Sequence, residues 1–238
     1  MKQNTCNNKI IFIFLFLLIF SNLIYSQTIK PNKYGLKVVD DINLYNKLVQ
    51  QDSTKKLVDL EKYIPGIKLD IRYATNNNFT KKILYKEAKA FLRLPAANAL
   101  KKIQSELKKK NLELKIYDAY RPYSITEILW ENVKDARYAS DPRKGSRHNR
   151  GCAVDLTIID SKTGKEIPMP TEYDNFTVKA HHSYMNLPKE VIKNRKILRD
   201  VMEKYGFKII TSEWWHYDFI GWSKYELLNI PFEELEQN

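Results

Sequence analysis

The spacing of hydrophobic and polar positions changes several times along the chain, which predicts a mixture of strands and helices. Alternation of apolar and polar positions, with many β-branched residues, is typical of strands, whereas apolar positions three and four apart are typical of helices. The alternating segments are 67–75, 112–120, 151–160, 207–210 and 213–221. The segments with helical spacing are 95–110, 124–136 and 188–206, and helical or mixed spacing occupies 40–52 and 53–64.

Residues that start or stop elements support this division. Pro95 and Pro188 are expected at the starts of helices, and Gly206 at the end of one. Ser124, followed three residues later by Glu127, predicts a capping box just after the sequence RPY. The sequence DSKTGK at 160–165 predicts a hairpin turn. Strands joined by short turns and mixed with helices predict an α+β fold, with a central, mainly antiparallel sheet flanked by helices.

The N-terminal segment departs from this pattern. Lys2 and Lys9 precede a wholly apolar run at 10–20, and Ser26 offers a small residue for cleavage. Residues 1–26 are therefore predicted to be a secretory signal peptide, with an uncleaved anchor as the alternative. Residues 27–37 are expected to be a linker and 38–238 a single domain, exported to the periplasm or secreted, with no stable membrane span after processing.

Composition narrows the class of protein. The chain has 43% apolar and 29% charged residues, which is enough for a core but excludes a protein with many membrane spans. Its net charge of +12 becomes +10 if residues 1–26 are removed, and a basic exported protein can be attracted to anionic wall polymers or membrane surfaces. Nucleic acid is not an expected partner, because an exported protein rarely meets it. Cys152 alone would remain after processing, so no internal disulfide is expected, and its period-two spacing with Val154, Leu156 and Ile158 predicts a small buried strand residue.

Two short constellations carry candidate chemistry. His148 lies seven residues before Asp155, and Glu213 lies three residues before His216. Catalytic zinc takes three protein ligands and keeps one position for water, so two histidines and one carboxylate would complete a site and leave the other carboxylate as a base. Each part alone also fits a structural role: a hydrogen-bonded surface histidine, an exposed aspartate on the open face of a strand, or a core strand built on Trp214 and Trp215.

The spacing of the second constellation raises a geometric requirement. Residues three apart on a flat strand point to opposite faces. For Glu213 and His216 to converge, the strand has to bulge or bend, or Glu213 has to lie just outside it. Asp118 and Arg121 close another strand, where Arg121 is either a structural ion-pair partner or a permanent cation beside a developing oxyanion.

Read in order, these segments resemble the D-alanyl-D-alanine dipeptidase family, the VanX-type zinc peptidases related to D,D-carboxypeptidases and to the hedgehog domain. The resemblance covers about residues 38–222. It is carried by YATNNNF, LYK…FLR…AA, DAYRP, SRHNRGCAVDLT, MPTEYDNF…AHH and SEWWHYDF. Two features depart from it: Cys152 stands where serine or alanine is expected, and the signal peptide contrasts with the cytoplasmic resistance enzymes of this family.

The resemblance implies a small α+β peptidase fold, one zinc ion per chain and a role for each motif residue. The ligands implied are His148, Asp155 and His216. Glu213 would be the general base, and Arg121 would stabilise the tetrahedral intermediate. Ser146 resembles the residue that holds the dipeptide carboxylate, and Asp174 the one that holds its ammonium group.

The expected reaction is zinc-dependent hydrolysis of D-Ala-D-Ala to two D-alanines in cell-wall peptide metabolism. The nearest alternative is a D,D-carboxypeptidase or endopeptidase that acts on longer stem peptides through an open groove. A binding module without catalysis could lose Glu213 or a ligand at no cost, yet all are present. The sequence leaves the oligomeric state open.

Overall fold

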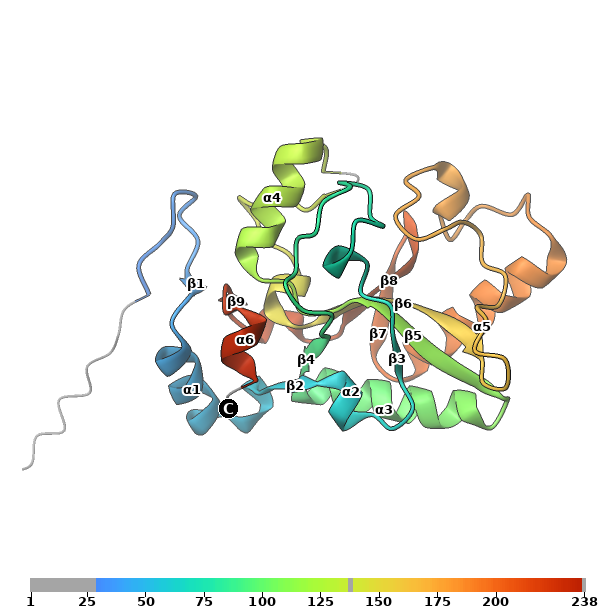
Figure 1. Cartoon of the computed structure of the whole chain (residues 1–238), viewed down its shortest axis with the longest axis horizontal. Coiled ribbons are helices and arrows are strands. Elements are labelled where there is room, and N and C mark those ends of the chain that lie inside the picture. The colour runs from blue at the N-terminus through green and yellow to red at the C-terminus, as the bar shows by residue number, and fades with distance from the viewer. Residues whose placement is uncertain (1–28, 137–138, 237–238) are drawn as a thin grey trace, which may run out of the picture.

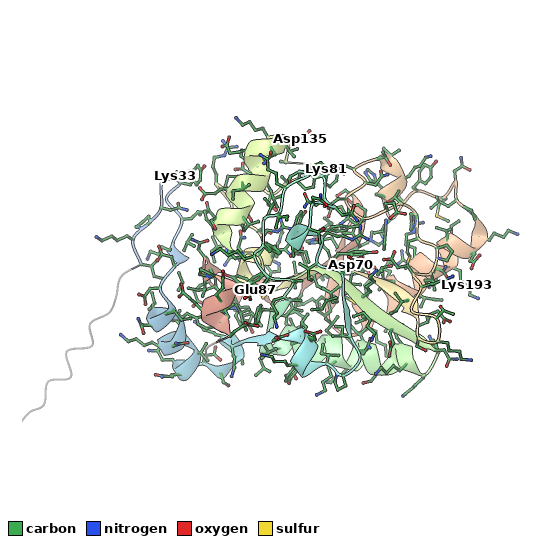
Figure 2. All side chains as sticks on the ribbon, in the orientation of Figure 1. Lys33, Asp70, Lys81, Glu87, Asp135 and Lys193 are labelled. Atoms are coloured by element: carbon green, nitrogen blue, oxygen red, sulfur yellow. The ribbon has the colours of Figure 1, made fainter. Side chains whose placement is uncertain are left out.

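The computed structural model describes residues 29–136 and 139–236 (Figure 1). The predicted signal peptide at 1–26 lies outside the described residues. Among the described helices, none is both long and apolar enough to cross a membrane. Charged side chains such as those of Lys33, Lys81 and Lys193 lie at the periphery of the molecule (Figure 2).

A five-stranded sheet forms the centre of the fold. Its strands are ordered β3 (Lys68–Leu69), β5 (Leu112–Asp118), β6 (Ala153–Asp160), β8 (Glu213–Phe219) and β7 (Phe207–Ile210). Only the edge pair β3–β5 is parallel, and the other three pairs are antiparallel. The prediction of a mainly antiparallel α+β fold is therefore confirmed.

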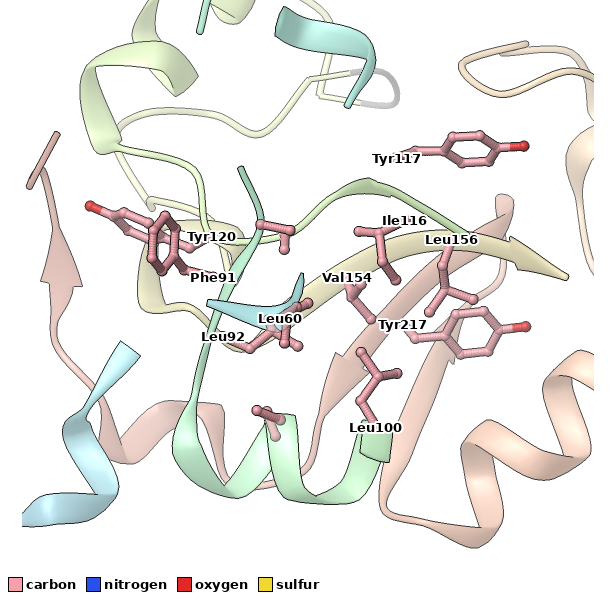
Figure 3. Packing of buried hydrophobic residues seen from close by; sticks show 14 of the residues in the cluster. Leu60, Phe91, Leu92, Leu100, Ile116, Tyr117, Tyr120, Val154, Leu156 and Tyr217 are labelled. Carbon is pink, nitrogen blue, oxygen red and sulfur yellow. The ribbon is translucent and has the colours of Figure 1, made fainter. Parts of the chain in front are cut away.

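Two long helices pack on the sheet, α3 (Leu94–Lys108) against β5 and α5 (Lys189–Lys204) against β7. Pro95 lies in the first turn of α3 and Pro188 caps α5, as the sequence predicts. Leu100 of α3 lies close to Val154, Leu156 and Tyr217, which come from neighbouring strands (Figure 3). These side chains fill the face of the sheet that packs on α3, and the loops that carry the candidate chemistry cover the other face.

Strand β6 is buried on both faces, so the expectation of an open face around Asp155 was wrong. Cys152, Val154, Leu156 and Ile158 are fully buried, as the period-two pattern predicts. Asp155 is only 3% exposed, because side chains from neighbouring strands and loops cover its face too. Beyond β6, the predicted turn at 160–165 forms, but the returning chain makes only an isolated bridge between Ile159 and Glu166.

The prediction of a strand over 67–75 was wrong for most of its length. After β3 the backbone turns into a 3-10 helix, η2 (Arg72–Ala74), with a hydrogen bond from the Ala74 amide to the Ile71 carbonyl. The alternation reflects burial of Ile71 and Tyr73 rather than sheet pairing. This turn directs Tyr73 into the cleft described below.

The capping box at Ser124 was also wrong. Helix α4 (Tyr123–Val133) begins after Pro122, one residue before the predicted cap, and the Ser124 amide donates to Asn229 Oδ1 at 2.9 Å. A side chain 105 residues away therefore satisfies the helix end, which local sequence signals cannot reveal.

The N-terminal part wraps around the side of the sheet. It contains α1 (Ile42–Gln51), capped by Asp41, and then the 3-10 helix η1 (Ser53–Lys55), β2 (Leu57–Asp59) and α2 (Leu60–Tyr63). Strand β2 pairs with β4 (Phe91–Arg93), and β1 (Val38–Val39) pairs in parallel with β9 (Leu227–Leu228), near α6 (Phe232–Leu235). Within the predicted linker, Pro31 and Lys37 form a bridge that closes a turn held by Asn32; the domain boundary itself stays a prediction.

Candidate active site

A cleft of about 400 Å³ opens on the loop-bearing side of the sheet. All seven residues that the sequence singles out line it, namely Arg121, Ser146, His148, Asp155, Asp174, Glu213 and His216. They come from segments up to 95 positions apart, so the tertiary fold brings together what the sequence separates. Other lining groups include Tyr73, Arg147 and His181.

Three neighbouring strands place carboxylate and imidazole groups in one row. Asp155 on β6 is paired across the sheet with Asp118 on β5 and with His216 on β8. Side chains directly opposite one another on adjacent strands lie in contact. The row therefore fixes Asp155 between two neighbouring residues on the side of the sheet where the cleft opens.

His148 reaches the same point from the 3-10 turn η3 (His148–Arg150). Its Nδ1 lies 2.6 Å from the Ala119 carbonyl oxygen, an acceptor, so Nδ1 donates and Nε2 keeps a free lone pair. The turn itself is held by Ser146, whose Oγ accepts from the His148 amide at 3.1 Å. Gly151 ends the turn with a φ of 65°, a left-handed conformation that glycine adopts without strain.

His216 is oriented by a carboxylate on its far side. Its Nε2 lies 2.9 Å from Asp218 Oδ1, which leaves Nδ1 directed at Asp155 Oδ1, 3.0 Å away. Burial disfavours a charged imidazole, but the hydrogen bonds to Asp155 and Asp218 raise the pKa of His216 to about 10. At neutral pH this pKa keeps a proton on Nδ1, and a metal ion that binds there would have to displace that proton.

The three donor atoms form a compact triangle. His148 Nε2, His216 Nδ1 and Asp155 Oδ1 are separated by 3.2, 3.0 and 3.5 Å. Donors at about 2.0–2.2 Å from a tetrahedral zinc ion lie roughly 3.3–3.6 Å apart, close to these separations. Two neutral imidazole nitrogens and one carboxylate are also the ligand chemistry that catalytic zinc prefers, so the residues present fit the ion.

Asp155 is held ionised in spite of its burial. Burial alone opposes its charge, but His148 and His216 hold the pKa of its carboxyl well below the usual range. Its second oxygen, Oδ2, accepts from the Tyr173 hydroxyl at 2.9 Å. Oδ1 thus forms one corner of the triangle, and the Tyr173 hydroxyl holds Oδ2 in place.

Glu213 lies beside the triangle but outside it. Its Oε2 is 4.0 Å from His216 Nδ1. Strand β8 bulges here, because Ile209 pairs with Tyr217 while the next residue, Ile210, pairs with Glu213. The bulge is what the three-residue spacing required, and it brings both side chains to one cleft. Burial raises the pKa of Glu213 to about 7, the range suited to a general base.

Arg121 is buried and locked in place. Its Nε and Nη2 donate to Asp118 Oδ2 at 2.9 and 2.7 Å, and its guanidinium lies 5.2 Å from the Tyr73 ring centre. Asp118 in turn accepts from the Tyr85 hydroxyl at 2.8 Å. Arg121 is therefore a structural ion-pair partner that also lines the cleft, and its role beside a developing oxyanion stays a prediction.

Asp174 occupies the loop between β6 and α5 with a left-handed φ of 57°. Its Oδ2 accepts from the Tyr73 hydroxyl at 3.1 Å. Burial, together with the carboxylates of Asp155 and Glu213, raises the pKa of Asp174 well above its usual value. A cation placed beside it would offset this repulsion.

Comparisons with known proteins agree on one family. A family model described as "D-ala-D-ala dipeptidase" matches residues 53–235. A D-alanyl-D-alanine dipeptidase of Escherichia coli is 36% identical over 179 residues, covering 75% of this chain and 92% of the relative. One from Enterococcus faecium is 31% identical, covering 66% of this chain and 88% of the relative. The chain belongs to the D-Ala-D-Ala dipeptidase family, whose members are zinc metallopeptidases.

Solved structures resemble this dipeptidase-family chain more distantly. The LD-carboxypeptidase LdcB matches with a TM-score of 0.41 and 22% identity over 76% of this chain and 77% of its own. The D,D-dipeptidase VanXYg, solved with a D-Ala-D-Ala phosphinate analogue, matches with a TM-score of 0.36 and 19% identity over 76% of this chain and 75% of its own.

In this family member, sequence reasoning gave no role to three residues that orient the site. Asp218 holds His216, Tyr173 holds Asp155, and Asp118 holds Arg121. Asp218 could have been found, because it lies two residues after His216 and so shares its face of the strand. Tyr173 gave no local signal, since it reaches Asp155 from a loop.

Proposed function

We propose that this chain hydrolyses D-Ala-D-Ala to two D-alanines, with zinc held by His148, Asp155 and His216. The observation that carries the proposal is the triangle of three donor atoms, 3.0–3.5 Å apart, with the carboxylate of Glu213 beside it. Membership of the family supports the same reaction.

The residues around the triangle divide the work of peptide hydrolysis. Bound zinc supplies a Lewis acid and lowers the pKa of a coordinated water towards about 7. Glu213 accepts a proton from the attacking water and passes it to the leaving amine. Arg121, fixed by Asp118, presents a permanent positive charge to the oxyanion that develops on the peptide carbonyl.

Two further residues suit the ends of a free dipeptide. A dipeptide carries an ammonium and a carboxylate, and each charge has to find a partner when it is buried. The half-buried Asp174 carboxylate is the candidate partner of the ammonium, and the Ser146 hydroxyl can donate to the carboxylate. Recognition of both ends would favour dipeptides over longer stem peptides.

The reaction would take place outside the inner membrane. The predicted signal peptide at 1–26 supports this location, because an exported enzyme would meet the dipeptides of the cell wall. The positive charge of the remaining chain suits that surrounding.

The decisive experiment compares substrates on the zinc-loaded protein. D-Ala-D-Ala, its N-acetylated form, L-Ala-L-Ala and a stem pentapeptide ending in D-Ala-D-Ala are incubated separately, and released alanine is measured. We expect efficient cleavage of the free D,D-dipeptide alone, abolished by a chelator and restored by zinc. A preference for the blocked dipeptide or the pentapeptide would contradict the dipeptidase proposal and favour a carboxypeptidase.

A variant in the same loop isolates the role of Asp174. Asp174→Asn should lose the preference for D-Ala-D-Ala over its N-acetylated form while it keeps its zinc. Glu172→Gln is the matched control, because Glu172 is exposed two residues earlier in the same loop. An unchanged preference in Asp174→Asn would return Asp174 to a turn-forming role.

A further inference from the structure

An ion pair lies directly behind the candidate metal ligands. Arg147 Nε is 3.5 Å from Asp218 Oδ2. The other oxygen of the same carboxylate, Oδ1, is 2.9 Å from His216 Nε2. Asp218 therefore uses one oxygen for each partner; its carboxylate is largely buried, whereas the Arg147 side chain is about half exposed.

Arg147 and Asp218 each lie close to a candidate metal ligand in the sequence. Arg147 immediately precedes His148, and Asp218 follows His216 by two residues on the same strand. The pair thus connects the 3-10 turn that carries one imidazole to the strand that carries the other. Backbone pairing also joins the two segments, because the Phe219 amide donates to the Cys152 carbonyl at 2.7 Å, but that bond lies beyond the end of the turn and does not orient either ring.

Trp222 limits the freedom of Arg147. It lies in the 3-10 helix η5 (Trp222–Lys224), and its indole ring is 4.7 Å from the Arg147 guanidinium carbon. The Arg150 guanidinium lies 5.5 Å from the same ring. A guanidinium stacked on an aromatic ring loses less entropy on pairing than a freely rotating one, so Arg147 is presented to Asp218 in advance.

We propose that Arg147 and Asp218 form a clasp that fixes the separation and orientation of the two zinc-binding imidazoles. The proposal rests on the metal site in the proposed function and adds two positioning residues to it. His216 Nε2 donates to Asp218, which leaves Nδ1 as the metal donor and prevents rotation of the ring. Arg147 holds Asp218 in the position where this hydrogen bond is made, and so keeps His148 Nε2 and His216 Nδ1 at the 3.2 Å found here.

A surface ion pair without this role would behave differently. Half-exposed pairs contribute little to stability, and their loss leaves distant sites unchanged. Partners that orient metal-binding histidines typically change metal affinity about 10- to 100-fold when they are removed. Zinc affinity therefore separates a positioning role from a merely structural one.

The test measures zinc dissociation constants of the full chain by competition with a chromogenic chelator. We expect Asp218→Asn to weaken zinc binding about 10- to 100-fold. Arg147→Ala should weaken it up to about fivefold, the range of a partly exposed pair. Arg147→Lys should recover part of that loss. In Asp218→Asn, adding Arg147→Ala should have little further effect, because the two residues act through one contact.

Arg143→Ala provides the matched control, since Arg143 pairs with Asp141 in the same loop but contacts no metal ligand. Cobalt-substituted protein gives a second readout, because its visible spectrum reports the ligand geometry and should change in Asp218→Asn but not in Arg143→Ala. Wild-type zinc affinity and an unchanged cobalt spectrum in both Arg147→Ala and Asp218→Asn would overturn the clasp. Absence of zinc binding in the wild-type protein would instead overturn the metal site on which it rests.

Discussion

Asp155, which contributes one corner of the triangle, and Glu213, which lies beside it, differ in what surrounds each carboxylate. Asp155 has one oxygen within 3.0 and 3.5 Å of the two imidazoles and the other fixed by Tyr173. Glu213 approaches His216 only to 4.0 Å, and its pKa is raised by burial. A carboxylate with a lowered pKa suits a cation, and one with a raised pKa suits proton transfer. Geometry and electrostatics therefore support the same division of roles.

This division gives different expected defects for residues three positions apart. Glu213→Ala should retain zinc and lose turnover by a factor of about 10² to 10⁴, because only the base is removed. His216→Ala should lose zinc affinity as well. Metal analysis of both purified variants, together with kcat, checks the prediction. Equal zinc loss in the two variants would make Glu213 a ligand.

Arg121 is held by two hydrogen bonds, from Nε and Nη2, that converge on one oxygen of Asp118, so its planar shape matters as well as its charge. We expect Arg121→Lys to lower kcat substantially with zinc content unchanged, because an ammonium cannot reproduce the guanidinium fork. The measurement is kcat and KM for D-Ala-D-Ala on zinc-loaded protein. Turnover near that of the wild-type protein would leave Arg121 only its structural ion pair with Asp118.

At the scale of elements, the 3-10 turn that carries His148 depends on a close backbone approach. Gly151 ends the turn, and its carbonyl accepts from the Arg93 amide at 2.9 Å. A Cβ added to Gly151 would overlap Leu57 Cδ2 and lie 3.4 Å from that amide nitrogen. Leu57 is buried, so it has little room to move aside.

Gly151→Ala should therefore destabilise the protein more than Gly164→Ala. Both residues have a left-handed φ, 65° and 69°, but a Cβ at Gly164 meets nothing within 4 Å. Backbone strain should cost about 1–2 kcal/mol in each variant. Overpacking should add about 1–3 kcal/mol in Gly151→Ala alone. Urea unfolding of the two variants measures the difference, and equal losses would show that the contact with Leu57 relaxes freely.

At the scale of the whole molecule, the candidate metal site joins elements that are distant in sequence. His148 comes from η3, Asp155 from β6 and His216 from β8. Without a metal ion, a protonated His216 is held between two carboxylates, as its raised pKa indicates. Zinc would replace this proton and tie the turn to the two strands. Since no disulfide forms at the free, buried Cys152, the metal is a natural source of added stability.

Zinc should accordingly raise the unfolding temperature. Free zinc at 100 times its dissociation constant stabilises a folded protein by about 2.7 kcal/mol. For a chain of this size that corresponds to a rise of roughly 5–10 °C. Calorimetry with zinc and with a chelator measures the shift, and His216→Ala should show almost none. A shift of the same size in that variant would place the stabilising zinc elsewhere.

The sequence by itself determined the long elements and the chemistry. Pro95 and the spacing after it predict α3, Pro188 and Gly206 bound α5, and strict alternation predicts β5 and β6, because these signals are local. The motif residues could be named because their signals are local too: histidines and carboxylates at short spacings indicate a metal site or acid–base catalysis. The three-residue spacing of Glu213 and His216 even predicts the distortion found in β8.

Only the tertiary structure decided how these residues are oriented. The row Asp118–Asp155–His216 exists because three strands pair in one register, and register depends on contacts distant in sequence. Contacts distant in sequence also decide three other features. They place the Asn229 side chain at the start of α4, replace the predicted strand after Leu69 with a turn, and bury both faces of β6. Hydrogen bonding and burial between remote segments leave no periodic signal in the chain, so the residues that orient the candidate metal ligands appear only once it has folded.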